Sequence, residues 1–122
     1  MADDKHGIDD RAFDFFCGVI RFVRTIQPEP GVRRLADQMV AAAGSIAANR
    51  EEATSGSSRK EFIRYNEIAL RSAKESVVWL RGCEATSIGD PRRCISLLGE
   101  ARQLAKILGA IVVSSKTGRT RL

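Results

Sequence analysis

Residues 49–75 read NREEATSGSSRKEFIRYNEIALRSAKE, and this stretch decides the fold. Its residues 54–57, TSGS, have the composition of a turn. Ser58 with Glu61 three positions later is the pattern of a capping box, in which each side chain bonds a free backbone N–H at a helix start. Apolar residues recur every three or four positions on both sides of the turn. The stretch therefore predicts a helical hairpin.

The same periodicity extends outward in both directions and predicts four helices. Their expected bounds are residues 9–27, 31–53, 59–84 and 91–115. Pro30 and Pro91 suit the first turn of the helices that follow them. Residues 1–8 and 116–122 are expected to be flexible tails. Four helices with short connections predict one all-α domain, an antiparallel up-down-up-down four-helix bundle.

The spacing also predicts which residues face the core. In the second helix they are expected at Leu35, Met39, Ala42, Ile46, Asn49 and Ala53. In the third they are expected at Phe62, Tyr65, Ala69, Ser72, Ser76, Trp79 and Cys83. In the fourth they are expected at Cys94, Leu98, Ala101, Ala105, Leu108 and Val112. The sets of the second and third helices contain polar side chains, so the bundle should bury some polar groups.

The first expected helix is apolar on more than one side. Its core-facing line is expected at Phe16, Val19, Val23 and Ile26. Phe15 and Phe22 point away from that line. One interpretation is a wide stripe that faces the core. The other is that Phe15 and Phe22 form an interface between subunits of an oligomer.

Folding the hairpin about its glycine brings polar residues to the same levels. Asn49 should lie beside Arg64, and Gln38 beside Glu75. The network expected at these two levels contains Asn49, Glu52, Arg59, Gln38, Ser72 and Glu75. Such a cluster can be a binding or catalytic pocket, or a structural network in which buried polar groups satisfy one another. We favour the structural interpretation, because the single histidine, His6, lies in the expected tail.

Charge is distributed unevenly along the 122 residues, whose formal net charge is +5. Residues 1–56 carry seven Lys and Arg against nine Asp and Glu, and residues 57–122 carry thirteen against six. No apolar run is long enough to cross a membrane, and the polar start lacks the apolar core of a signal peptide. We therefore expect a cytoplasmic protein that does not associate with membranes, with its three cysteines as free thiols.

The basic half contains a line of cations at helical spacing on the third helix. Its members are Lys60, Arg64, Arg71, Lys74 and Arg81, and Arg92 and Arg93 of the next helix add to the same half. One interpretation is an ordinary solvated helix face. The other is a surface for RNA or DNA phosphates. No aromatic residue interrupts the line, so base stacking and sequence specificity are not expected.

Sequence signatures of enzymes are absent. The chain contains no P-loop, GxGxxG, HExxH, CxxC or GxSxG motif. A histidine-based triad or metal cluster has too few ligands to form. We predict no catalytic residues, no enzymatic activity, no cofactor and no metal site.

The motif around the turn resembles a known family. The residues that carry the resemblance are Ser45-Ile46, Asn49, Glu52, Arg59, Lys60-Glu61-Phe62, Arg64-Tyr65, Ile68-Ala69, Ser72 and Glu75. They resemble the four-helix bundle proteins encoded in intervening sequences of bacterial 23S rRNA genes. This resemblance implies assembly into a ring, commonly a homopentamer, and nucleic-acid binding without established enzymatic activity. The chain is also similar to the accessory variability protein of diversity-generating retroelements, which implies a reverse transcriptase as an alternative partner and an interaction scaffold as an alternative function.

Two departures from the family pattern concern the second helix. A Pro-Ser pair of the family is replaced by Ala47-Ala48, so the kink that proline introduces is not expected. An Arg-Arg pair of the family is replaced by Val40-Ala41, which removes two cations from that surface. Arg33 and Arg34 are the nearest substitutes on the same helix.

Overall fold

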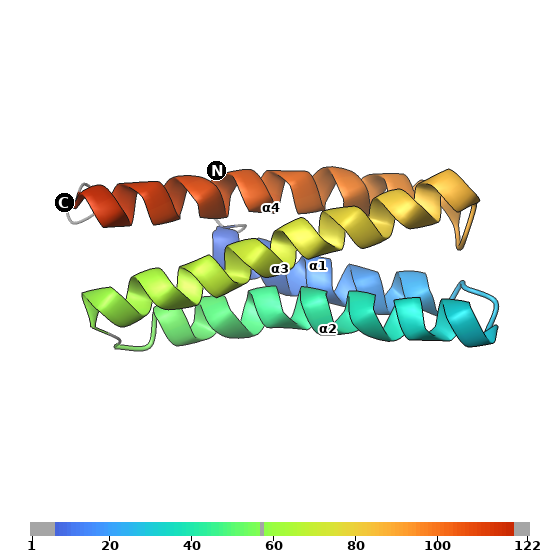
Figure 1. Ribbon diagram of the computed structural model, residues 1–122, viewed down its shortest axis with the longest axis horizontal. Helices are drawn as coiled ribbons and strands as arrows, with labels where there is room; N and C mark the ends of the chain where they lie inside the picture. The colour runs from blue at the N-terminus through green and yellow to red at the C-terminus, as the bar shows by residue number, and fades with distance from the viewer. Residues whose placement is uncertain (1–6, 57, 119–122) are drawn as a thin grey trace.

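The computed structural model describes residues 7–56 and 58–118, and helices are the only regular elements in these two ranges. They are α1 (Ile8–Val23), α2 (Pro30–Ala53), α3 (Arg59–Thr86) and α4 (Pro91–Thr117). The connections between them lie at alternate ends of the molecule, so each helix runs opposite to the one before it (Figure 1). An all-α fold of four helices, as the sequence predicts, is confirmed.

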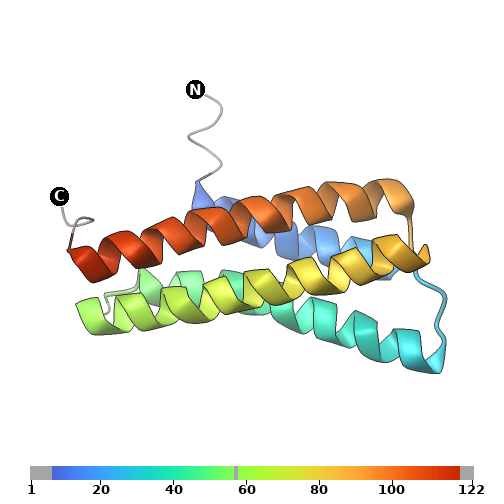
Figure 2. The same cartoon turned by 45° about the horizontal axis from the view of Figure 1, so that its top comes forward.

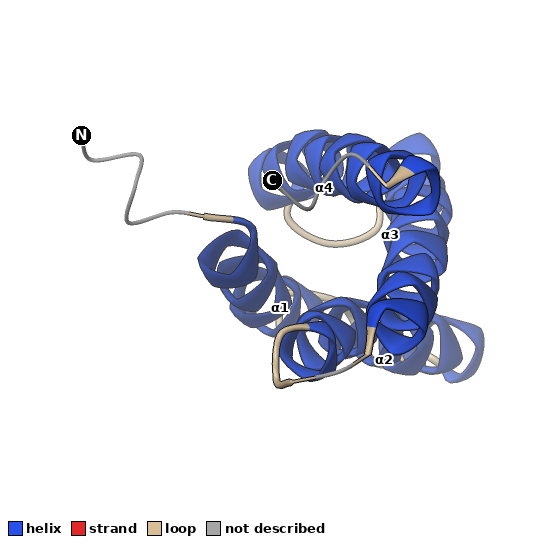
Figure 3. Cartoon of the chain, turned by 90° about the vertical axis from the view of Figure 1, so that its left-hand side faces the viewer, coloured by secondary structure: helices blue, strands red, loops and turns tan. Residues whose placement is uncertain are grey.

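The helices pack around a common core. Each helix packs against the next one in the chain, and α1 also packs against α4. The second view shows α3 and α4 side by side along most of their length, and the view along the bundle places α1 diagonally opposite α3 (Figures 2 and 3). Within the described residues, no helix is both long and apolar enough to cross a membrane. The expected tails lie mostly in residues 1–6 and 119–122, outside the described residues.

Side-chain hydrogen bonds cap the N-terminal ends of α3 and α4. The capping box at α3 is present: the Ser58 hydroxyl accepts a hydrogen bond from the Glu61 N–H at 3.2 Å, and the Glu61 carboxylate accepts one from the Ser58 N–H at 3.3 Å. Asp90 caps α4 by accepting a bond from the Arg93 N–H at 2.9 Å, just before Pro91.

Helix α1 ends at Val23, four residues earlier than predicted. The Thr25 hydroxyl donates a hydrogen bond to the Phe22 carbonyl at 2.6 Å and accepts one from the Asp90 N–H at 3.0 Å. The Thr25 side chain therefore satisfies a carbonyl at the end of α1 and connects this end to the α3–α4 connection. The helix ends at this point.

The core confirms most of the predicted positions in α2 to α4. The buried residues common to prediction and structure are Met39, Ala42, Ile46, Ala53, Ala69, Ser72, Ser76, Cys83, Cys94, Leu98, Ala101, Leu108 and Val112. Of the predicted positions that are not fully buried, Leu35, Phe62 and Ala105 are half-buried, and three others are displaced by one residue along a helix. Arg50, Asn66 and Leu80 are buried, whereas their neighbours Asn49, Tyr65 and Trp79 are half-buried. Because most of the other predicted positions are buried, the predicted side of each of these helices faces inward.

The prediction that Phe15 and Phe22 form an outer interface is wrong. Their side chains are 2% and 0% exposed within the single chain, together with Val19 of the same face. Phe22 lies so close to Gly89 that a Cβ atom there would approach its ring to 2.6 Å. Residues 12, 15, 19 and 22 also follow helical spacing, and this second line through the apolar helix is the one that faces the core.

Candidate nucleic-acid interface

The five predicted cations of α3 all lie on its exposed side. Lys60, Arg64, Arg71, Lys74 and Arg81, which we call the α3 basic row, are each exposed. They lie about half a turn around the helix from the buried line of Ala69, Ala73, Ser76 and Leu80. From residue 60 to residue 81 the helix rises by 21 steps, which corresponds to about 31 Å. A straight row of this length can contact several phosphates of an extended polyanion at once.

The acidic residue within the row is paired by a neighbouring helix. Glu67 forms an ion pair with Lys116 of α4, with 2.7 Å between its carboxylate oxygen and the ammonium nitrogen. Glu75, the next acid along α3, is exposed and follows Arg71 by four residues, so it lies beside the row on the same side of the helix. The five cations of the row therefore face solvent together with two carboxylates, of which Glu67 is paired with Lys116.

Two cations of α4 extend this surface, and the sequence interpretation missed them. Arg102 and Lys106 are exposed. Lys116 pairs with α3 and so marks the α3 side of α4, and Arg102 and Lys106 lie about 40° and 80° around the helix from it. Glu100 pairs with Arg11 of α1 and marks the opposite side. Arg102 and Lys106 therefore lie on the α3 side of α4.

The register of α3 against α4 sets the level of these two cations. The Cys94 thiol donates to the Leu80 carbonyl at 3.4 Å, and the Arg59 guanidinium donates to the Ser115 carbonyl near the other end. Between these contacts, Arg102 and Lys106 are level with the middle of the α3 basic row. Their four-residue spacing was visible in the sequence, but their level depends on how α3 and α4 pair.

Arg92 and Arg93 do not extend the α3 basic row. Both are exposed, and they line a shallow depression together with Gly18 of α1 and Leu97 of α4. They therefore lie toward α1, on the other side of α4 from the row. Their proximity in sequence to Arg81 results from the short α3–α4 connection and does not place them on the same surface.

The buried polar network has different members from those predicted. Arg50 is only 6% exposed and joins three helices. Its Nε donates to the Asp9 carboxylate of α1 at 2.8 Å, and its Nη1 donates to the side-chain oxygen of Asn66 of α3 at 2.8 Å. Asn66 in turn donates to the Phe62 carbonyl at 2.8 Å. Arg50 follows the buried Ile46 by four residues, which is the sequence signal that could have predicted its burial.

The predicted network is corrected accordingly. Asn49 donates to Ser45 of its own helix, at 2.8 Å to the carbonyl, instead of lying against Arg64. Ser72 donates to the Ser45 hydroxyl at 2.8 Å and is the α2–α3 contact at this level. Gln38 and Glu75 are both exposed and do not form the second cluster.

The two remaining residues of the predicted network lie at the hairpin end. The Arg59 guanidinium donates a hydrogen bond to the Ser115 carbonyl, so it stabilises α3 against α4. Glu52 is exposed near the turn. Between α2 and α3, the polar contacts include those of Arg50 with Asn66 and of Ser72 with Ser45.

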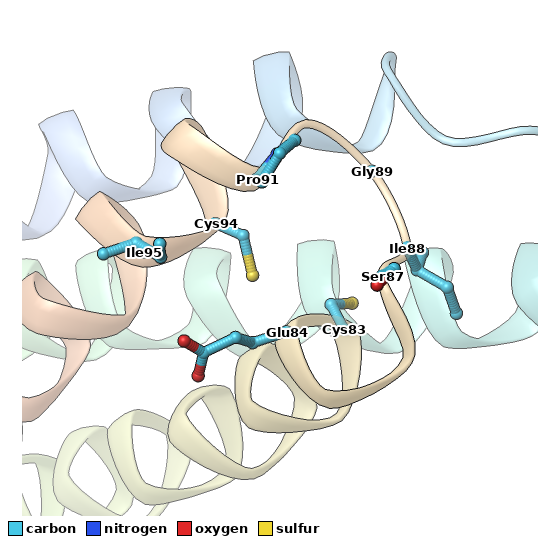
Figure 4. A pocket seen from close by; sticks show the side chains of 8 residues that line it. All are labelled: Cys83, Glu84, Ser87, Ile88, Gly89, Pro91, Cys94 and Ile95. Carbon is cyan, nitrogen blue, oxygen red and sulfur yellow. The ribbon is translucent and has the colours of Figure 1, made fainter.

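A small pocket lies at the α3–α4 connection and contains two thiols. It has a volume of about 140 Å³ and is lined by Cys83, Glu84, Ser87, Ile88, Gly89, Pro91, Cys94 and Ile95 (Figure 4). Burial, with a smaller contribution from Cys94, raises the pKa of Cys83 to about 11, and burial also raises the pKa of Cys94. Both thiols are therefore protonated at neutral pH and are poor nucleophiles.

The contacts of these thiols are typical of core packing. The Cys83 sulfur lies 3.8 Å from the sulfur of Met39 on α2, and Cys94 bonds the Leu80 carbonyl. All three cysteines are free. Among the described residues, no three His, Cys, Asp or Glu side chains are arranged to hold a metal ion. The exposed cations, and not this pocket, are therefore the candidate site.

These features define a four-helix bundle whose α2–α3 hairpin is aligned by polar contacts and whose α3 presents exposed cations. The chain belongs to the 23S rRNA-intervening sequence protein family, whose sequence profile matches residues 5–110. The resemblance carried by the motif around the turn is thereby confirmed.

A solved structure supports the same relationship. It is the crystal structure of a protein of unknown function from the S23 ribosomal protein family of Bacteroides thetaiotaomicron. The two chains are 25% identical and superpose with a TM-score of 0.78, over 87% of this chain and 98% of the other. No curated protein matches this chain. The similarity covers nearly the whole fold, so the four-helix architecture is shared.

Proposed function

We propose that this protein is a non-enzymatic, homo-oligomeric bundle that binds RNA or DNA through the α3 basic row. The observation that carries the proposal is the alignment of five exposed cations along one side of a single rigid helix. Phosphates dominate the affinity of proteins for nucleic acids, and such contacts need cations at fixed positions more than they need a pocket. The free thiols fit a reducing compartment, and we place this function in the cytoplasm.

Assembly would increase the effect of each row. We propose that the chains form a ring, a homopentamer in the family's usual arrangement, in which the row is repeated once per subunit. Several rows that contact one polyanion raise the affinity without any new kind of contact, because later contacts form within an existing complex. The resulting binding depends strongly on the salt concentration.

The apolar surface that best suits a contact between subunits lies on α1 and α2. Phe16 packs against Gly44, where a Cβ atom would approach its ring to 3.1 Å. Phe13 and Ile20 flank Phe16 on the same side of α1, at spacings of three and four residues. Phe13 is 57% exposed, although it is a large aromatic side chain.

The facing part of α2 carries no charge. Val40 and Ala47 flank Gly44 at the same spacings, and residues 38–49 contain no Lys, Arg, Asp or Glu. We call Phe13, Ile20, Val40, Gly44 and Ala47 the α1/α2 apolar face. This face replaces Phe15 and Phe22 as our proposed interface, since those two side chains are already buried within one chain.

Binding of the purified protein to labelled RNA and DNA at several salt concentrations tests the proposal. We expect Arg71→Glu with Lys74→Glu to weaken binding at least about tenfold at about 0.1 M salt, because two phosphate contacts become repulsive. The matched control is Arg33→Glu with Arg34→Glu, which changes the charge equally on α2 and should have a smaller effect. Absence of binding by the unaltered protein at low salt would refute the proposal.

A specific observation favours the alternative, an accessory subunit for a protein such as a reverse transcriptase. Val78, Ile95 and Val113 are 55%, 58% and 63% exposed. Val78 lies within the α3 basic row, and Val113 follows Lys106 by two turns on the same side of α4. Exposed aliphatic residues among cations suit an acidic protein partner. This alternative would be favoured by two results together: the protein captures such a partner and Val78→Asp loses it, and the unaltered protein does not bind nucleic acid at low salt.

A further inference from the structure

We infer that the ligand of this surface is a nucleic-acid duplex contacted on the phosphates of both strands, and not a single strand. The inference rests on the proposed function and specifies its ligand. It depends on the arrangement of cations on two helices, on the length and rigidity of the row, and on the absence of exposed aromatic side chains from this surface in the described residues.

The cations form two parallel lines. Arg71 and Lys74 lie on α3, and Arg102 and Lys106 lie at a similar level on the neighbouring side of α4. Packed helices have axes about 8–10 Å apart. Because the side chains project outward from both helices, the two lines of charge lie at least about this far apart. This separation suits the major groove of B-DNA, about 12 Å wide, better than the minor groove, about 6 Å wide. Two lines of cations at this spacing can each contact the phosphates on one side of a groove, whereas a single strand offers one line of phosphates.

The length of the row suits a stiff helical ligand. The α3 basic row extends over about 31 Å, close to the 34–36 Å of one turn of B-DNA. Its cations project from a helix whose opposite side is fully packed, through residues such as Ala69, Ala73 and Leu80. A rigid duplex can meet such a fixed array with little loss of conformational entropy, whereas a flexible single strand must first be ordered along it.

The surface also lacks the groups that hold single strands. Proteins that bind single strands without sequence preference stack bases on aromatic side chains. The aromatic residues of α3, Phe62, Tyr65 and Trp79, are half-buried. In the part of the chain that the structure describes, the exposed large aromatic side chain is Phe13, on α1, which lies diagonally opposite α3 (Figure 3). Unpaired bases would therefore find no stacking partner beside the cations.

Fluorescence anisotropy with labelled oligonucleotides of about 24 nucleotides tests the inference, a length that covers about two helical turns. The probes are a DNA duplex, an RNA duplex of the same sequence, and the separate strands of each. We expect the duplexes to bind at least about tenfold more tightly than their strands at equal salt. Contacts to four to six phosphates would make log K fall with log salt at a slope of about −4 to −5 for a duplex. The DNA and RNA arms identify which duplex is preferred.

The second line of cations is tested by Arg102→Ala with Lys106→Ala. Loss of two phosphate contacts should reduce the magnitude of the duplex slope by about 1.8. The matched control, Arg33→Ala with Arg34→Ala, removes the same charge from α2 and should leave the slope unchanged. All four side chains are exposed, and circular dichroism checks that both variants remain folded.

The possible failures of the two proposals are distinguishable. Equal or tighter binding of single strands overturns the duplex inference while the proposed function stands. An unchanged slope in the Arg102→Ala, Lys106→Ala variant also overturns it, because the second line would then make no phosphate contacts. Absence of binding to every probe at low salt overturns the proposed function itself.

Discussion

At the scale of single residues, the side chain that connects most of this bundle is Arg50. Its guanidinium joins α1, α2 and α3 through Asp9 and Asn66, although it is almost fully buried. A buried guanidinium is tolerated only when its donors have partners, and removal of one partner leaves the others unsatisfied. Asp9 is itself half exposed, with a side-chain exposure of 49%, so water screens part of its attraction to Arg50.

We predict that Arg50→Ala destabilises the fold by about 1–3 kcal/mol. The main reason is that the Asn66 side-chain oxygen, which is fully buried, loses its donor, and a cavity forms in place of the guanidinium. Urea unfolding followed by circular dichroism measures the effect. Arg33→Ala is the control, because Arg33 is exposed and should change the free energy of unfolding by less than about 0.5 kcal/mol. Equal effects of the two changes would contradict the structural role of Arg50.

At the scale of helices, the sequence predicts the elements that have one apolar side and fails for the one that does not. In α2, α3 and α4, charged residues mark the outer side, so the buried line is predicted mostly to within one residue. In α1, apolar residues occupy most of the circumference, and the sequence alone does not select between the lines through Phe16 and through Phe15. The selection depends on neighbours, since Phe22 fills the space beside Gly89 and Phe16 lies against Gly44.

The residues of the candidate site also differ in whether the sequence alone predicts their position. The α3 basic row is a property of one helix, because its cations oppose a buried face that helical spacing predicts. The contribution of Arg102 and Lys106 depends on the register between α3 and α4, which follows from contacts such as Cys94 with Leu80. The pairing of Arg50 with Asp9 joins residues 41 positions apart and has no local signal beyond the burial of its helix face. Sequence therefore predicts single faces, and pairing between helices requires the structure.

The α3–α4 connection provides a prediction at this scale, at Gly89. Its φ of +78° is a conformation that glycine adopts easily, and a Cβ atom would lie 2.6 Å from the Phe22 ring. Gly56 has a similar φ of +85° in the α2–α3 turn, but nothing lies within 4 Å of its Cβ position. Gly56→Ala should therefore cost only the backbone strain, about 1–2 kcal/mol.

Gly89→Ala adds the displacement of a buried aromatic ring, and we predict a total cost of about 2–4 kcal/mol. Thermal unfolding of both variants in parallel isolates the steric part, since the backbone strain is common to them. Equal destabilisation would mean that Phe22 moves aside freely, which would contradict its tight packing at the end of α1.

At the scale of the whole molecule, the two outer surfaces have different compositions and suit different roles. The α3–α4 side carries the α3 basic row, Arg102 and Lys106, and the α1/α2 apolar face is uncharged. Because α1 lies diagonally opposite α3, chains that associate through the α1/α2 apolar face leave their cations free for a ligand (Figure 3). Like charges on neighbouring subunits also repel, which favours assembly through the uncharged side.

This division predicts opposite outcomes for two substitutions two residues apart. Phe13→Lys places a charge on an exposed position, so it should lower the solution mass to that of a folded monomer without loss of helicity. Phe15→Lys places a charge in the core, where it should destabilise the fold by more than about 3 kcal/mol. Light scattering measures the mass, and circular dichroism measures the helicity. If Phe13→Lys retains the mass of the unaltered protein, or if the unaltered protein is itself a monomer at micromolar concentration, the α1/α2 apolar face is not the interface, and the avidity expected from repeated rows is lost with it.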